Sequence, residues 1–391
     1  MRLLIVSTSA GTGHTMAATA LEEAAASLLP TAEVASVDVL DFTSPVYRRA
    51  YSRSYLRVVD RMPSLWGYLY DTFDDRRAQQ DQAKLLRAMD WVESAAFRRF
   101  VSDWAPDATL ATHFLGPQIL EPSRRRQHGR SFLGIVITDF HAHSYWMQST
   151  ADRYFVGDDE LRFSLERRGV PAGRIAVTGI PIRLAFAARR SKAAMRAALG
   201  LEPDALVVLV MGGGLGFGEI ETAVEVALGV EGTQVVALAG RNSALEKRLA
   251  RVAADLGGRL RVAGFVPNVY EFMAAADVAV TKPGGVSASE AIALGLPLIL
   301  TDPIPGQEER NCDYLQEAGV ALEAHGADSL AYKLTLVLSD ETTRRRMRRA
   351  ALRARRPRAA QEIVSLVAQA VGGGDGARVV EADRDPVPEK R

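Results

Sequence analysis

Short apolar segments alternate with longer amphipathic segments along the first half of the chain. The apolar segments have the length of strands and are RLLIVSTS (2–9), EVASVDVL (33–40), ATLATHF (108–114), SFLGIVITDF (131–140), RYFVG (153–157) and RIAVTGI (174–180). Residues 15–29, between the first two, have the pattern of a helix. Strands that alternate with helices form right-handed βαβ units and a parallel sheet. The first half is therefore predicted to be one doubly wound α/β domain.

The same alternation starts again after an Arg- and Ala-rich helical segment at 183–199. Its apolar segments are ALVVLVMGGG (205–214), TQVVALAG (233–240), RLRVAGFV (259–266), DVAVTKPGG (277–285) and LPLILTD (296–302). A length of 391 residues also fits two domains. We expect doubly wound domains at 1–182 and 192–365, followed by a disordered Gly- and charge-rich tail at 372–391.

The overall composition excludes several classes of protein. Hydrophobic residues make up 48% of the chain and the net charge is +1, unlike a disordered chain or a basic nucleic-acid-binding protein. Cys312 is the only cysteine, so an internal disulfide and a CxxC zinc site are excluded. No run of 18 apolar residues occurs, and the first apolar segment is too short for the core of a signal peptide. We expect a cytoplasmic protein with at most peripheral membrane contact, and nothing in the sequence indicates its oligomeric state.

Glycine-rich turns follow three of the predicted strands, at 11–13, 212–218 and 284–285. In open α/β sheets, ligands bind at the carboxyl ends of strands, where glycine allows close approach and the next helix N-terminus attracts anions. One such turn is equally typical of a plain strand-to-helix connection, but three in two domains favour a nucleotide. None matches G-x-G-x-x-G, and no G-x-x-x-x-G-K-[ST] occurs, which disfavours NAD and P-loop chemistry.

Glu290 lies just inside the Ala-rich helix predicted after the third turn. A carboxylate there is mildly stabilised by the helix dipole, which needs no ligand. It is also a good acceptor for the two hydroxyls of a ribose, while the preceding amides can hold a diphosphate. A second polar cluster at 306–311 follows the next strand and could bind sugar hydroxyls, or could simply be a solvated helix start.

Four segments together resemble a known family. They are VTKPGGVSASEAIALGLPLILTDPIPGQEERN (280–311), GTGH (11–14), ITDFHAHSYW (137–146) and VTGIPI (177–182). They are similar to the glycolipid-forming glycosyltransferases of family 28, in particular the bacterial diacylglycerol glucosyltransferases and, less closely, the plant monogalactosyldiacylglycerol synthases. The similarity covers roughly residues 1–365. It implies a GT-B fold, in which two Rossmann-like domains face a central cleft, with the acceptor bound by the N-terminal domain and the UDP-sugar by the C-terminal one.

The resemblance implies a set of donor-binding residues by position. Glu290 would bind the ribose, Phe265 would lie near the uracil, and Lys282 would assist with phosphate charge. The diphosphate would be held by the 212–218 turn, including Gly213 and Gly214, and by the amides of Val286, Ser287 and Ala288. Gln307 and Glu308 would bind the hexose, which could be glucose or galactose.

The implied reaction inverts the anomeric configuration and needs no metal or other cofactor. His14 is the first candidate for the base that deprotonates the acceptor, since an imidazole titrates near neutral pH. Asp139 could orient His14 or act as the base itself. Some plant-type relatives have an acid five residues before the loop histidine, where this chain has Ser9. The only Asp-x-Asp lies in the tail at 383–385, so we expect no metal site.

Residues 44–77 combine aromatic and basic side chains at helical spacing. Such a helix suits a lipid headgroup interface, although a helix packed on its own sheet gives the same pattern. The predicted acceptor and membrane residues are Gly13, Tyr51, Arg53, Tyr55, Trp66, His143 and Trp146. An Arg-rich segment at 344–358 could also contact anionic lipid or be a solvated helix.

The sequence therefore predicts a glycosyltransferase that moves a hexose from a UDP-sugar to the sn-3 hydroxyl of diacylglycerol. Its partners would be the UDP-sugar, diacylglycerol and the anionic inner surface of the cell membrane. Three alternatives stay open: N-acetylglucosamine transfer to a lipid II-type acceptor, a UDP-sugar 2-epimerase of the same fold, and a UDP-sugar sensor without turnover.

Overall fold

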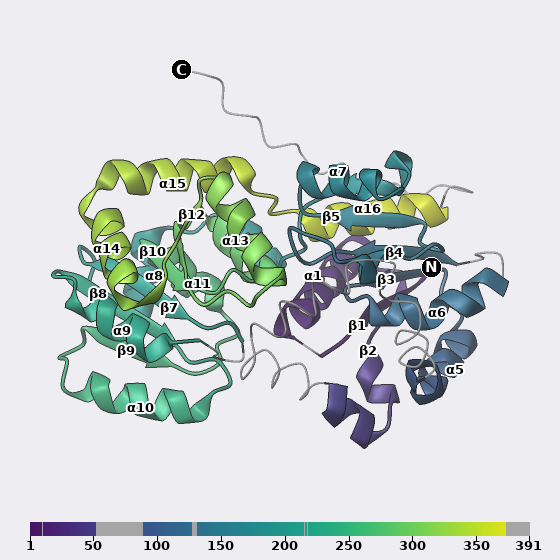
Figure 1. Ribbon diagram of the computed structural model, residues 1–391, viewed down its shortest axis with the longest axis horizontal. Coiled ribbons are helices and arrows are strands. Elements are labelled where there is room, and N and C mark those ends of the chain that lie inside the picture. The colour runs from purple at the N-terminus through teal and green to yellow at the C-terminus, as the bar shows by residue number, and fades with distance from the viewer. Residues whose placement is uncertain (10, 52–88, 127–130, 215, 217, 373–391) are drawn as a thin grey trace, which may run out of the picture.

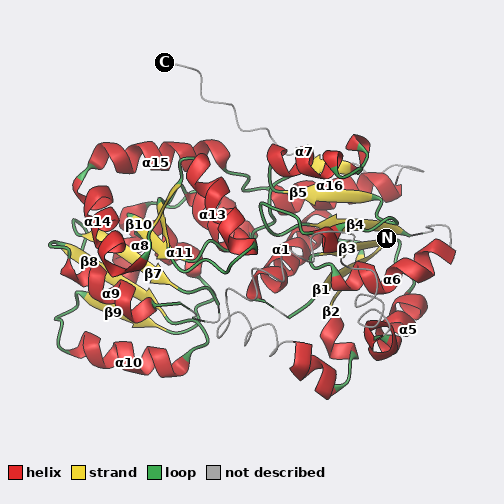
Figure 2. Ribbon diagram, in the orientation of Figure 1, coloured by secondary structure: helices red, strands yellow, loops and turns green. Residues whose placement is uncertain are grey.

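The computed structural model describes the chain except for residues 10, 52–88, 127–130, 215, 217 and 373–391. In the described part, the strands form two six-stranded sheets, with the orders β2-β1-β3-β4-β5-β6 and β12-β11-β10-β7-β8-β9. All of the paired strands are parallel. Helices surround both sheets, which lie side by side (Figure 2). The predicted pair of doubly wound α/β sheets is confirmed.

The N-terminal sheet consists of β1 (Arg2–Ser7), β2 (Glu33–Asp38), β3 (Ala108–Ala111), β4 (Phe132–Val136), β5 (Arg153–Val156) and β6 (Ile175–Val177). The other elements of this half are α1 (Thr12–Leu28), η1 (Val39–Phe42), α5 (Ala95–Trp104), α6 (Leu115–Arg126), η2 (Ser144–Trp146), α7 (Asp159–Arg167) and η3 (Ala172–Arg174). Strands β3 and β4 are almost wholly buried. Since parallel strands covered on both faces need apolar side chains on both, their continuous apolar runs are expected.

The C-terminal sheet consists of β7 (Leu206–Met211), β8 (Thr233–Leu238), β9 (Leu260–Ala263), β10 (Val278–Thr281), β11 (Leu298–Leu300) and β12 (Ala321–Glu323). Its helices are η4 (Leu184–Ala187), α8 (Lys192–Leu199), α9 (Ile220–Gly229), α10 (Ser243–Ala254), α11 (Val269–Ala275), α12 (Gly285–Leu294), α13 (Gln307–Glu317), α14 (Gly326–Ser339) and α15 (Glu341–Ala354). Each turn from a strand of this sheet to the next helix lies at the carboxyl end of that strand, as a ligand site of this fold requires.

The last helix returns to the N-terminal half. Helix α16 (Ala359–Gly372) lies beside the N-terminal sheet in Figure 1, although it follows the helices of the C-terminal half in sequence. Ala360, Ile363, Val364 and Val367 are fully buried in one cluster with side chains of β1, β4 and α1. The predicted C-terminal domain at 192–365 is therefore wrong at its end. The apolar face of α16 covers the first sheet, whereas α12 and α15 belong to a core cluster of the C-terminal half.

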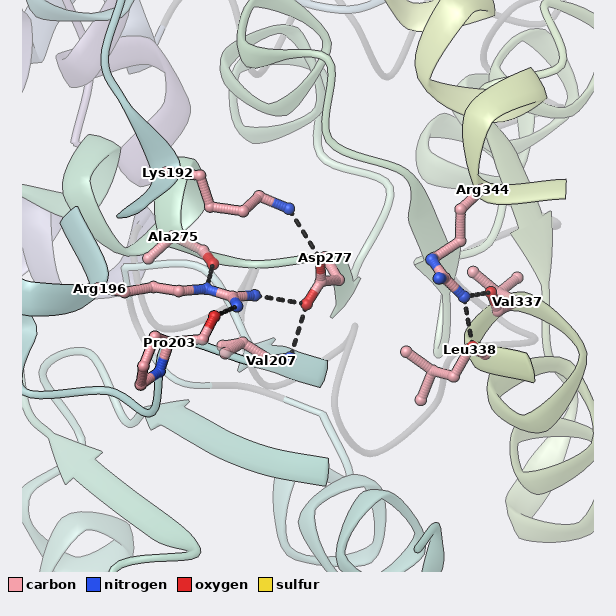
Figure 3. Close-up of polar contacts among 9 residues, drawn as sticks. All are labelled: Lys192, Arg196, Pro203, Val207, Ala275, Asp277, Val337, Leu338 and Arg344. Atoms are coloured by element: carbon pink, nitrogen blue, oxygen red, sulfur yellow. Dashed lines mark hydrogen bonds and ion pairs between the residues drawn. The ribbon is translucent and has the colours of Figure 1, made fainter. Parts of the chain in front are cut away.

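A partly buried ion cluster fixes α8 to the amino ends of the central strands β7 and β10. The Asp277 carboxylate accepts hydrogen bonds from Lys192 Nζ, Arg196 Nη2 and the Val207 amide, each at 2.7 Å (Figure 3). Arg196 also donates to the carbonyls of Ala275 and Pro203. Figure 3 further shows Arg344, which donates to the Val337 carbonyl at 2.9 Å and to that of Leu338, at the end of α14. The charged groups on Asp277 are thus paired and hydrogen-bonded, as buried charges must be.

Candidate active site

The glycine turns of the two halves meet at one seam. A β-carbon at Gly285 would lie 2.2 Å from the Thr138 carbonyl oxygen, and one at Gly214 would lie 2.8 Å from the Thr12 side chain. A β-carbon at Gly13 would make ordinary contact with Val286, at 3.6 Å. Only glycine allows the approach at Gly285, because the atom in the way is backbone. The seam therefore brings the start of α1, the end of β4 and the start of α12 together.

The orientation of His14 is set by main-chain and hydroxyl groups. Its Nδ1 lies 2.8 Å from the Thr112 carbonyl oxygen and 3.0 Å from Thr138 Oγ1. Thr112 Oγ1 in turn donates to the His14 carbonyl at 2.9 Å. Since a carbonyl can only accept, Nδ1 carries the proton and the neutral ring keeps its lone pair on Nε2. Burial lowers the pKa of His14, while the Asp139 charge and the Thr112 hydrogen bond act against this.

Aromatic side chains form the wall behind His14. The His113 ring lies edge-on at 4.7 Å between centroids, and the Trp146 ring lies at 6.3 Å. His113 Nδ1 accepts from the Leu115 amide at 3.1 Å, and burial, with the nearby His14, holds the His113 pKa well below its usual value. Trp146 is only 4% exposed and belongs to an apolar cluster with β4 and β5. The predicted contact of Trp146 with the acceptor stays a prediction, and its ring lies beside the His14 imidazole.

Asp139 is held by the opposite domain. Its carboxylate accepts from Gln307 Nε2 at 2.6 Å and from Asn311 Nδ2 at 3.0 Å. Burial raises the pKa of Asp139, and the Asn311 hydrogen bond, the His14 charge and the Gln307 hydrogen bond lower it in turn. The carbonyl of Thr112, rather than Asp139, therefore orients the His14 ring. Asp139 acts on His14 through its charge.

Glu290 is a buried carboxyl group without a hydrogen-bond donor among the described residues. It is 5% exposed, and burial raises its pKa to about 8, against the effect of Arg183. Arg183 donates to Glu23 Oε1 of α1 at 2.7 Å and to the Pro267 carbonyl at 2.9 Å. A buried group with unused acceptors is a candidate for binding a ligand that donates. This position agrees with a ribose-binding role.

The first turn of α12 offers fewer amides than predicted. The Ala288 amide donates to the Gly284 carbonyl at 2.9 Å, as the first hydrogen bond of the helix. No acceptor for the Val286 and Ser287 amides occurs among the described residues. Ala288 is therefore removed from the predicted anion-binding amides, because its N–H already makes the first hydrogen bond of the helix. Lys282 lies nearby, with its Cε 3.2 Å from the position of a β-carbon at Gly218.

Phe265 and Arg241 form an exposed pair at the end of the C-terminal sheet. Phe265 follows β9 and is 50% exposed, and the Arg241 guanidinium carbon lies 5.0 Å from its ring centroid. Gly213 is in the left-handed region, with φ +68°, and the next carbonyl, of Gly214, accepts from the Arg241 amide at 3.0 Å. Sequence reasoning missed Arg241, although its place directly after a strand was a usable signal.

The polar side chains at the start of α13 already form hydrogen bonds with other groups of the protein. Gln307 donates to Asp139, and Glu308 Oε2 accepts from the Ile304 amide at 2.7 Å. Burial raises the pKa of Glu308, and the charge of Lys282 opposes this. Their predicted contacts with a hexose stay predictions. Asn311 belongs to the predicted polar cluster at 306–311, but its contact with Asp139 was not predicted, although its spacing places it one helical turn after Gln307 on the same face of α13.

Only some of the predicted acceptor and membrane residues lie in the described part of the chain. Arg53, Tyr55 and Trp66 lie outside the described residues. Tyr51 stacks on Tyr47, with centroids 5.8 Å apart, and packs against an apolar cluster of the N-terminal half. His143 is buried and accepts from the Tyr145 amide at 3.2 Å. Tyr51 thus supports the alternative in which this face of the helix covers its own sheet.

The described residues contain neither a group of metal ligands nor a membrane-spanning helix. In that part of the chain, no three His, Cys, Asp or Glu side chains are grouped so as to hold a metal ion. Among the same residues, no helix combines the length and the apolar character needed to cross a bilayer.

Two family models match the chain. Residues 14–182 match monogalactosyldiacylglycerol (MGDG) synthase, and residues 218–354 match glycosyl transferases group 1. A processive diacylglycerol beta-glucosyltransferase of Bacillus subtilis (strain 168) is 28% identical over 353 residues, which cover 89% of this chain and 90% of that protein. A protein of the same description from Bacillus mycoides (strain KBAB4) is 33% identical over 264 residues, 67% of each chain.

Solved structures show the fold. MurG of Acinetobacter baumannii matches with a TM-score of 0.60 and 14% identity, over 94% of this chain and 99% of that one. A putative UDP-N-acetylglucosamine 2-epimerase from Listeria monocytogenes matches with a TM-score of 0.61 and 17% identity, over 96% and 97%. The fold is thus shared with a putative 2-epimerase, one of the alternative functions. Only the similarity in sequence distinguishes a diacylglycerol glucosyltransferase from this alternative. The predicted resemblance is confirmed: the chain belongs to the glycosyltransferase family of the processive diacylglycerol beta-glucosyltransferases.

Proposed function

We propose that the protein transfers a hexose from a UDP-sugar to diacylglycerol and forms a β-glycosyldiacylglycerol. The observation that carries this proposal is the similarity to diacylglycerol beta-glucosyltransferases over both halves of the chain. The MGDG synthase match begins at His14 and includes Thr112, Thr138 and Asp139, the groups that surround the imidazole. The donor-binding residues lie across the seam from these groups.

In this proposal the UDP-sugar lies along the carboxyl edge of the C-terminal sheet. Glu290 accepts the hydroxyls of the ribose, and the Phe265 ring stacks near the uracil. The Val286 and Ser287 amides and the Lys282 ammonium bind the diphosphate, whose negative charge grows as it leaves. Two amides at a helix N-terminus and one cation supply the positive charge, so the scheme contains no metal ion.

The reaction is a single displacement. The acceptor hydroxyl oxygen forms a bond to the anomeric carbon, the bond from that carbon to the diphosphate oxygen breaks, and the hydroxyl proton passes to His14 Nε2. The Nδ1–H hydrogen bond to Thr112 holds the ring in the tautomer that can accept this proton. The Asp139 charge stabilises the imidazolium that forms, as an oriented carboxylate does in other acid–base pairs.

The membrane surface is reached from the N-terminal half. Val46 is 77% exposed and Val92 is 71% exposed, and with exposed Met89 they flank the undescribed residues 52–88 on both sides. Exposed apolar side chains beside a basic and aromatic segment suit insertion into an anionic headgroup region. Replacing Val46 and Val92 by Ser should reduce sedimentation with anionic vesicles, and the exposed Val252→Ser variant is the control. Equal sedimentation of the two variants would exclude this surface.

The first test uses purified protein with diacylglycerol vesicles and labelled UDP-glucose or UDP-galactose. A labelled glycolipid that is absent with the His14→Ala variant is the expected result, and the more productive donor identifies the hexose. A parallel incubation with UDP-N-acetylglucosamine and no lipid tests for epimerisation. A product there, with no glycolipid from either donor, would reject the proposal in favour of the epimerase.

A further inference from the structure

Asn311 of α13 lies at the centre of the seam between the two halves. Its side chain is 0% exposed. Its Nδ2 donates to Asp139 Oδ1 and to the Pro283 carbonyl, both at 3.0 Å, and its Oδ1 accepts from the Phe140 amide at 2.9 Å. Both hydrogens of the amide and its oxygen are therefore used.

These contacts fix the orientation of the amide. Exchange of its oxygen and nitrogen would place an acceptor against Asp139 and Pro283 and a donor against the Phe140 amide. A carboxylate in its place would have no hydrogen to donate to either acceptor. The site thus requires a planar amide in one orientation.

The three partners of Asn311 belong to different parts of the mechanism. Asp139 and Phe140 follow β4 in the N-terminal half, whereas Pro283 directly precedes the glycine turn that begins α12. The same turn approaches the Thr138 carbonyl at Gly285. One side chain therefore links the carboxylate beside His14 to the helix start proposed for the diphosphate.

We propose that Asn311 is a positioning residue, which holds the Asp139 carboxylate beside His14 and in register with the first turn of α12. The role of the pair in transfer rests on the function proposed above. Asn311 touches neither substrate in this scheme. It assembles the proton acceptor and the leaving-group site as one unit, so that neither is complete unless the two halves are in contact.

Loss of the Asn311 side chain should shift the pKa values of Asp139 and His14 in opposite directions. Without the Asn311 donor the buried Asp139 carboxylate is less stable, so its pKa rises further. When Asp139 takes up a proton, the imidazolium of His14 loses its counter-charge and the pKa of His14 falls. The other titratable groups that face the pair are His113 after β3, Glu308 of α13, and Lys282 and Asp302 beside Glu308.

The test compares Asn311→Ala with Asp139→Asn, the double variant and Gln316→Ala. Gln316 is a matched control, an amide on α13 whose Nε2 bonds to Glu323 at 3.1 Å, away from the seam. Thermal unfolding and the Kd of UDP establish that each variant is folded. Asn311→Ser, which retains one donor and leaves a smaller cavity, replaces Asn311→Ala if the latter is unstable.

The expected result has three parts. Asn311→Ala lowers kcat by at least about tenfold, the order of one lost hydrogen bond to a charged group, with little change in the KM of the donor. The acid limb of its pH profile, which reports protonation of His14, moves to lower pH as the His14 pKa falls, and a general loss of stability would not produce this shift. In the Asp139→Asn background the same substitution has no further effect on kcat, because Asn311 acts through Asp139.

A readout without substrate separates this inference from the proposed function. The His14 imidazole is titrated by NMR in each variant, and its midpoint should fall in Asn311→Ala as in Asp139→Asn, but not in Gln316→Ala. If the wild-type protein makes no glycolipid but these midpoints fall, the proposed function fails and the positioning role stands. Unchanged midpoints in Asn311→Ala, or effects on kcat that multiply with those of Asp139→Asn, overturn the positioning role.

Discussion

Replacement of Glu290 by Gln tests the UDP-sugar site, because this carboxyl group is buried and, among the described residues, no hydrogen-bond donor stabilises its charge. Burial raises its pKa from 4.5 to about 8. Between these two pH values the folded protein binds a proton that the unfolded chain has released, so stability falls as pH rises through this window. The Glu290→Gln variant has no charge to bury and should not show this loss.

The magnitude follows from the same pKa. A rise from 4.5 to about 8 corresponds to at most about 5 kcal/mol in the free energy of unfolding above pH 8. UDP acts in the opposite direction, since two ribose hydroxyls donating to a charged carboxylate contribute roughly 2–4 kcal/mol. At pH 7 part of that energy ionises Glu290, at a cost of about 1.4 kcal/mol. Affinity for UDP should therefore increase from pH 6 to pH 8, with release of a proton.

The assay combines thermal unfolding without ligand and calorimetric titration with UDP. Glu290→Gln should unfold at a higher temperature than the wild type at pH 8.5 and at a similar one at pH 5. Its Kd for UDP should be weaker and independent of pH, and repeated titrations in buffers of different ionisation enthalpy should show no proton release. A wild-type Kd that does not vary with pH, together with an unchanged Kd in Glu290→Ala, would refute the ribose assignment.

Two further substitutions test the base and the scaffold. His14→Ala should lower the rate of transfer by roughly 10²- to 10⁴-fold, the usual contribution of a general base, with an unchanged Kd for UDP; near-normal turnover would remove His14 from the chemistry. Asp277→Ala should cost about 3 kcal/mol in urea unfolding, because it leaves the buried Arg196 and the partly exposed Lys192 without a counter-ion. Exposed Glu225→Gln is the control, and an equal midpoint for the two variants would contradict the buried-cluster interpretation.

Periodicity predicted the sheets well because both are parallel and covered on both faces. Each strand is then a short apolar run, and such runs are visible in one dimension. The end of the second domain could not be predicted in the same way. The apolar stripe of α16 shows that this helix covers a sheet, but not which sheet, and its buried residues face the first one.

In the candidate site too, residues with a local sequence signal were predicted and residues defined by distant contacts were not. Glu290 and His14 were identified because each follows a glycine turn at a strand end, where the fold places ligands. The burial of Trp146 was not predicted, because an aromatic residue beside a cleft has the same sequence signal whether it packs inward or outward. The cluster at 306–311 was identified, but the role of Asn311 in it was missed because its partners at 139, 140 and 283 are far away in sequence. Contacts between domains leave no local pattern.

The two buried carboxyl groups of the site differ in what stabilises them, and this suggests an order of events. Asp139 already receives two amide hydrogen bonds and faces an imidazole, so its charged form is supported before any substrate binds. Glu290 has no such donor among the described residues, and its charged form becomes favourable only when a ligand donates to it. In the proposed function, the acid–base pair is thus preorganised for catalysis, whereas the UDP-sugar site gains its charge on binding. We expect discrimination for a nucleotide that carries a ribose, because a ligand with only one hydroxyl offsets less of the free energy needed to ionise Glu290.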